Sequence, residues 1–123
     1  MASSTRNTIA WILQILLALA FIASGGNKLL HISDTVVGFG KMGFPSWFAY
    51  FIGVAEVLGG IGLLVPRFMR LAAVGLMLVM LGAAYVHATK IPGGLLPNGF
   101  PALGLLVLLV VVFLLRRPAP ARA

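Results

Sequence analysis

The sequence predicts an all-α integral membrane protein, a four-helix bundle with both termini on the cytoplasmic side. The first observation is composition, because 61% of the 123 residues are hydrophobic and only 9% are charged, whereas a soluble domain carries about a quarter charged residues. The second is that the apolar residues form four blocks of roughly the length needed to cross a hydrocarbon core of about 30 Å. The third is an uneven distribution of arginine and lysine among the segments that connect these blocks.

Glycine, proline and basic residues separate the apolar blocks and predict where each helix ends. The expected spans are residues 8–27, 47–65, 70–88 and 100–115, followed by a basic tail over 116–123, and together they form one transmembrane domain, residues 1–123. Pro45 precedes the second span, which fits the preference for proline at helix starts, where no backbone amide is needed. Residues 28–45 are expected to form a short segment lying on the surface over the mouth of the bundle, or an ordinary loop.

The basic residues predict the orientation. If all four blocks span, six arginines lie on one side and three lysines on the other, which makes the arginine side cytoplasmic by the positive-inside rule. The arginines are Arg6, Arg67, Arg70, Arg116, Arg117 and Arg122, and the lysines are Lys28, Lys41 and Lys90. The expected location is a bacterial or archaeal cell membrane, with the N and C termini in the cytoplasm.

The first block has an alternative interpretation as a cleaved signal peptide. Arg6 precedes the apolar stretch, and Ala23, Ser24 and Gly25 resemble a small-residue cleavage site. A spanning helix is favoured because the block is long for the apolar core of a signal and because its polar residues share one helical face.

The net charge of +7 does not indicate a nucleic-acid partner, because the cations stand singly or in pairs between apolar blocks instead of forming one basic face. The absence of cysteine excludes disulfides and thiolate metal sites. Glu56, His31 and His87 lack the spacing of metal ligands, so no metal is predicted. The expected partners are the lipid bilayer, other membrane or membrane-associated subunits, or further copies of the chain.

Glu56 lies in the middle of the second expected span. An acid at the centre of a bilayer costs about 2.5 to 3.5 kcal/mol on translocon scales, so its carboxylate is expected to face the bundle interior. Gly53 and Gly60 fall on the same helical face as Glu56, at spacings of three and four residues. Small residues there would let another helix, or a ligand, approach the carboxylate closely.

The first and third spans carry further polar candidates. Lys28, Ser24 and Gln14 share one face of the first span, and His87 lies on a face of alanines and methionines in the third. Lys28, Glu56 and His87 are therefore expected to project toward one interior region, and Gln14 and Ser24 are additional candidates for ligand binding or proton exchange. The fourth span, almost all leucine and valine, is expected to be scaffold.

These residues also make the chain resemble the DoxX-like family of small bacterial and archaeal membrane proteins. The matching stretches are Phe21–Leu30, Phe39–Glu56, Gly53–Arg67 and the third span ending in His87. The most specific part is Gly-x-x-Lys, from Gly25 to Lys28, followed by Glu56 and His87 in successive spans. The resemblance implies a four-helix membrane bundle and, for some relatives, a role as the small subunit of a quinone-linked oxidoreductase that acts on thiosulfate with a partner subunit.

The leading hypothesis is a small accessory subunit of a quinone-linked redox system, which binds a quinone or similar lipophilic ligand inside the bundle. Glu56 would exchange a proton or accept a hydrogen bond, Lys28 would stabilise negative charge, and His87 would donate to a ligand oxygen. One alternative is a structural or assembly subunit that packs through glycine and alanine faces without ligand chemistry. Another is a small proton-coupled transporter.

Overall fold

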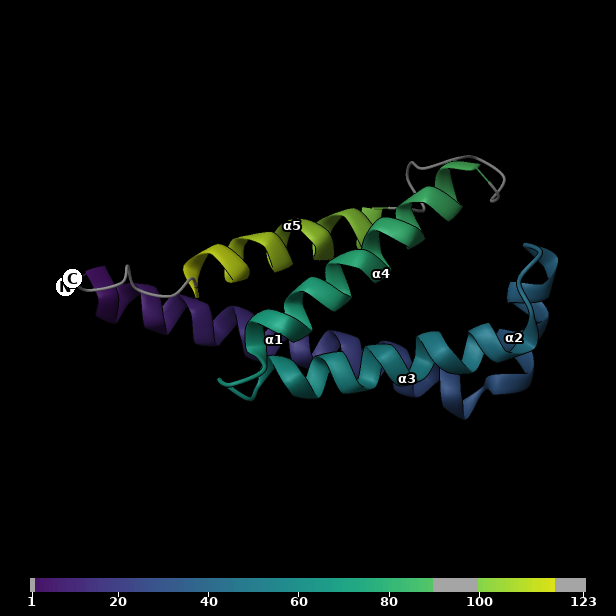
Figure 1. The fold of residues 1–123 in the computed structure, drawn as a ribbon, viewed down its shortest axis with the longest axis horizontal. Helices are drawn as coiled ribbons and strands as arrows, with labels where there is room; N and C mark the ends of the chain where they lie inside the picture. Colours follow the sequence, from purple (N-terminus) through teal and green to yellow (C-terminus); the bar gives the residue numbers. More distant parts are fainter. Residues whose placement is uncertain (1, 90–99, 117–123) are drawn as a thin grey trace.

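The described part of the chain folds into five helices. The structure, a computed structural model, describes residues 2–89 and 100–116, apart from the side chains of residues 2, 3, 87 and 100. The elements are α1 (Ala2–Leu30), α2 (Ile32–Lys41), α3 (Ser46–Leu63), α4 (Met69–Thr89) and α5 (Phe100–Leu115), with no strand in this part of the chain (Figure 1). The predicted all-α class is confirmed for these residues.

Three of the helices are long and apolar enough to cross a membrane. The qualifying segments are Ser4–Leu30, Ser46–Leu63 and Met69–Val86. Helix α5 is the most apolar of the described helices but has 16 residues, which gives about 24 Å at 1.5 Å per residue, less than the thickness of a typical hydrocarbon core. A fourth membrane span therefore stays a prediction, as does the side of the membrane on which the termini lie.

The region between the first two apolar blocks is more regular than a loop. Helix α1 continues to Leu30, three residues beyond its expected end, and α2 follows almost at once. The Thr35 hydroxyl donates to the backbone oxygens of Lys28 and His31, both at 3.0 Å, and so fixes the corner between the two helices. Gly43 then takes a φ of 90°, a conformation that only glycine adopts readily, and the chain reverses into α3.

The four longer helices pack as a ring. Helix α1 packs against α3 and α5, and α4 also packs against α3 and α5. Helix α2 packs against the N-terminal end of α3 (Figure 1). Helices α3 and α4 touch near their short connection, where an added Cβ on Gly59 would meet Leu76 and one on Gly62 would meet Ala72. Beyond those contacts α4 diverges from α3 toward the α2 end (Figure 1).

The core runs between α1, α3, α4 and α5. Its largest fully buried side chains are Phe21, Leu17, Leu63, Met69, Leu76, Leu109, Gln14 and Val112. Three of these, Gln14, Leu17 and Phe21, lie on the face of α1 that ends in Ser24 and Lys28. That face of α1 is therefore turned into the bundle, toward α3.

Glycines set the distance between α1 and α3. A Cβ on Gly25 would lie 2.5 Å from the backbone oxygen of Gly53 and 2.9 Å from Cβ of Glu56. A Cβ on Gly60 would lie 3.0 Å from the backbone oxygen of Ala18, and one on Gly53 would lie 2.8 Å from the Leu29 side chain. Gly53 and Gly60 thus stand at the contact with α1, and Gly25 is the matching glycine on α1 itself.

Substituting Gly25 by alanine should separate α1 from α3, because the new methyl would clash with a backbone oxygen that cannot rotate away. We expect a loss of about 1 to 3 kcal/mol in the free energy of unfolding, measured by denaturation in mild detergent. Gly26→Ala is the matched control, since nothing lies within 4 Å of its added Cβ; it should be neutral or stabilising. Equal effects of the two substitutions would contradict the packing described here.

Candidate functional site

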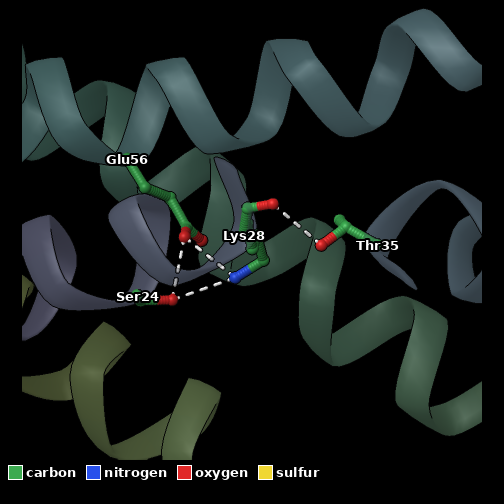
Figure 2. Close-up of polar contacts among 4 residues, drawn as sticks. All are labelled: Ser24, Lys28, Thr35 and Glu56. Carbon is green, nitrogen blue, oxygen red and sulfur yellow. Dashed lines mark hydrogen bonds and ion pairs between the residues drawn. The ribbon is translucent and has the colours of Figure 1, made fainter. Parts of the chain in front are cut away.

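Three polar side chains meet between α1 and α3 and form what we call the Ser24–Lys28–Glu56 cluster (Figure 2). The Lys28 ammonium donates to Oε1 of Glu56 at 2.9 Å and to Oγ of Ser24 at 2.9 Å. The Ser24 hydroxyl in turn donates to the same carboxylate oxygen at 2.9 Å. Each side chain of the cluster therefore contacts the other two.

The helices place these side chains for simple reasons. Ser24 and Lys28 are four residues apart on α1, so they lie one above the other on the same face. Glu56 reaches them from α3 because Gly25, between the two, has no side chain to hold α3 away. The hydrogen bond from Thr35 to the Lys28 backbone oxygen also joins α2 to this point (Figure 2).

The ion pair is buried on one side only. The Glu56 side chain is 4% exposed, whereas that of Lys28 is 26% exposed. A buried carboxylate is costly unless it is paired and hydrogen-bonded, and here one oxygen of Glu56 receives both donors. The other oxygen, Oε2, has no hydrogen bond to any described residue, and of the three ammonium protons of Lys28 two are used. The cluster thus retains one acceptor and one donor that its own hydrogen bonds do not use.

A cavity of about 940 Å³ opens beside the cluster, where α3 and α4 diverge. This is near the upper end of the range for small-molecule sites. Its walls include residues of all five helices, and the polar residues of its described lining are Ser24, Lys28, Glu56 and Tyr85. The remaining described lining is apolar. The charged residues of the described lining are Lys28 and Glu56, which lie together on one wall.

Aromatic rings from α2, α3 and the turn between them close the end of the cavity. The ring centroids of Phe39 and Phe44 are 6.0 Å apart, and those of Phe44 and Phe48 are 4.9 Å apart and stacked. All three side chains line the cavity. The sequence did not identify them as one wall, because their meeting depends on the reversal at Gly43.

Gln14 lies away from the cluster, although it shares a face of α1 with Ser24. Ten residues of helix separate the two, which is about 15 Å along the axis. The Gln14 amide donates to the Leu63 backbone oxygen at 2.6 Å, and its Oε1 accepts a hydrogen bond from Nε of Arg116 at 2.5 Å. Gln14 therefore belongs to a different group of polar residues, at the opposite end of the bundle.

His87 belongs to α4, but its side chain lies outside the described part of the structure. Its role as a donor to a ligand stays a prediction. Of the five candidate residues, the structure thus brings Ser24, Lys28 and Glu56 together and places Gln14 elsewhere.

Comparison with known proteins agrees with the membrane fold. The sequence profile of the DoxX-like family matches residues 12–114. A protein of Bacillus subtilis (strain 168) named "Putative oxidoreductase CatD" is 28% identical over 81 residues, which cover 66% of this chain and 60% of the length of that relative. No solved structure matches significantly. Because the family profile covers most of the chain, this protein belongs to the DoxX-like family.

Proposed function

We propose that this protein is a small accessory subunit of a membrane redox system and that it binds a quinone-type lipophilic ligand in the cavity beside the Ser24–Lys28–Glu56 cluster. The observation that carries the proposal is a cavity of about 940 Å³ whose described lining is mostly apolar and includes the charged pair Lys28 and Glu56. Most ligand sites combine an apolar chamber with a few polar groups that fix orientation. A ligand with a polar head and an oily body suits both parts.

The chemistry of the lining fits a quinone. Quinone oxygens accept hydrogen bonds, and the ammonium of Lys28 has a proton to donate. The rings of Phe39, Phe44 and Phe48 offer apolar faces for a flat ring, while leucines, valines and alanines of α4 and α5 suit a hydrocarbon tail. A bound quinone would supply reversible uptake of two electrons and two protons.

The residues of this chain would hold and orient the head of the ligand. Lys28 would stabilise negative charge on a ligand oxygen, and Glu56 would hold a proton or accept a hydrogen bond through Oε2. Ser24 would fix the relative positions of the Glu56 carboxylate and the Lys28 ammonium through its hydrogen bonds to both. His87 remains the predicted second donor.

The redox context is supported by the comparisons only in outline. A relative is named as an oxidoreductase, but the matched segment spans 60% of the length of that relative. A redox role for this chain is therefore a proposal. The source of electrons would be a separate subunit. In the proposed arrangement α5 is the fourth span and the arginine end of the bundle faces the cytoplasm, as the positive-inside rule favours.

Filling the cavity should weaken ligand binding without unfolding the protein. Gly82 lines the cavity, and an added Cβ there would meet no atom within 4 Å. We expect Gly82→Leu to raise the Kd for a short-chain ubiquinone about tenfold, since displacing or straining packed groups costs on the order of 1 to 3 kcal/mol.

The readout is quenching of Trp47 in a Trp11→Phe background, because the Trp47 ring lies 5.7 Å from that of Phe48, a lining residue. Gly104→Leu is the matched control, since its site is equally open but outside the lining. Absence of saturable quenching in the unsubstituted cavity, or equal loss in both variants, would refute the proposed site.

Substitutions of Lys28 and Glu56 should have strongly non-additive effects on the free energy of unfolding. Lys28→Met leaves the buried carboxylate of Glu56 with only Ser24 and should cost about 3 kcal/mol in the free energy of unfolding, at the low end for a broken buried pair because Lys28 is partly exposed. Adding Glu56→Leu should recover much of this loss, as measured by denaturation in detergent. We expect the double variant to be folded but unable to bind the ubiquinone. A double variant that binds as tightly as the original protein would instead make the pair a structural clasp and favour the assembly role.

A further inference from the structure

A second polar group lies at the opposite end of the bundle, where α1 begins and α5 ends. We call it the arginine cluster; it consists of Asn7, Gln14, Arg70 and Arg116. Nε of Arg116 donates to Oε1 of Gln14 at 2.5 Å, and Nη1 donates to Oδ1 of Asn7 at 2.7 Å. The remaining nitrogen, Nη2, is buried and has no hydrogen-bond partner among the described residues.

Both arginines are held in place by aromatic rings. The guanidinium carbon of Arg70 lies 3.8 Å from the ring centroid of Phe113, and Nη1 donates to the Phe113 backbone oxygen at 3.2 Å. The guanidinium carbon of Arg116 lies 5.2 Å from the ring centroid of Trp11. Cations over aromatic faces are stabilised and their positions restricted, so the two charges are fixed before any ligand arrives.

A cavity of about 350 Å³ lies between the two arginines. Its lining consists of Asn7, Trp11, Gln14, Pro66, Met69, Arg70 and Arg116. Every group there other than the arginines is neutral.

No side-chain carboxylate can balance this charge. The sequence contains two acids; Glu56 is paired with Lys28, and Asp34 lies in α2, which caps the far end of α3. A partly buried guanidinium without a counter-ion, and with an unpartnered N–H, is unfavourable. The two arginines therefore have no side-chain counter-ion among the described residues.

We propose that the arginine cluster binds a phosphate group, either the phosphodiester of an anionic phospholipid or free phosphate. The planar fork of arginine matches phosphate oxygens with two parallel hydrogen bonds, and two arginines facing one cavity allow both to contact the same group. The site lies at helix ends beside a tryptophan, a residue enriched where membrane meets water. It is separate from the proposed quinone cavity and does not depend on it.

Trp11 provides the readout, since Arg116 lies over its ring. In a Trp47→Phe background, the full-length protein in neutral detergent is titrated with dihexanoyl phosphatidylglycerol, with inorganic phosphate, and with dihexanoylglycerol, which lacks phosphate. We expect a saturable change in Trp11 emission with phosphatidylglycerol and none with dihexanoylglycerol. An equal response to inorganic phosphate would identify the soluble anion as sufficient and would also support the site.

Variants test the residues. Arg70→Gln and Arg116→Gln should each weaken binding about tenfold or more, as expected for loss of a charge-assisted hydrogen bond. Arg67→Gln is the matched control, because Arg67 is exposed in the α3–α4 connection and lies outside the cavity lining. This variant should bind phosphate as before.

If Arg116→Gln does not fold by circular dichroism, Arg116→Lys should still weaken binding, because lysine keeps the charge but lacks the planar guanidinium that forms two parallel hydrogen bonds. Binding that is unchanged in the Arg70 and Arg116 variants, equal binding of dihexanoylglycerol, or no binding of either phosphate compound would overturn the proposal.

Discussion

The carboxylate of Glu56 constrains the packing of α1 against α3. An ion in the middle of an apolar helix must find a partner inside the protein, and here the partners are Lys28 and Ser24 on the adjacent helix, at 2.9 Å. They come within reach because Gly25 lets the backbones of α1 and α3 approach until a single added Cβ would touch the oxygen of Gly53. The glycine contact and the ion pair therefore depend on each other, and α2 is tied to the same place through Thr35.

The tight α1–α3 pair also explains where space opens elsewhere. Helices α3 and α4 are in contact near their connection, through Gly59 and Gly62, and then separate. The space between them is lined by α5 on one side and by the rings of Phe39, Phe44 and Phe48 on another. Glu56 and Lys28 line this space, so the pair that stabilises one interface would also supply the polar groups of the proposed ligand site. The arginine cluster occupies the other end, with its own cavity and no side-chain carboxylate from the described residues.

Periodicity and composition were sufficient to place four of the five described helices, α2 being the exception. The apolar blocks of the sequence coincide with α1, α3, α4 and α5 to within a few residues, except at the N-terminus of α1, because breakers and charges bound them. Spacing of four residues also put Ser24 and Lys28 on one face. Periodicity assigns a face but not a depth, so it grouped Gln14 with residues about 15 Å away along the helix. The contact of Arg116 with Gln14, 102 residues apart in sequence, and the aromatic wall of the cavity depend on tertiary packing and on the turn at Gly43, for which no local pattern exists.

Lys28 is proposed to contact the head of a lipophilic ligand, and the environment of its ammonium can be observed directly. The chain has three lysines, Lys28, Lys41 and Lys90, so lysine labelled with ¹³C at Cε should give three signals by NMR in detergent, each assignable by a Lys→Arg substitution. On titration with a short-chain ubiquinone, the account predicts a saturable shift of the Lys28 signal while the Lys41 signal stays in place. A Lys28 signal that does not move at saturating ubiquinone, or one that moves no more than that of Lys41, would contradict it.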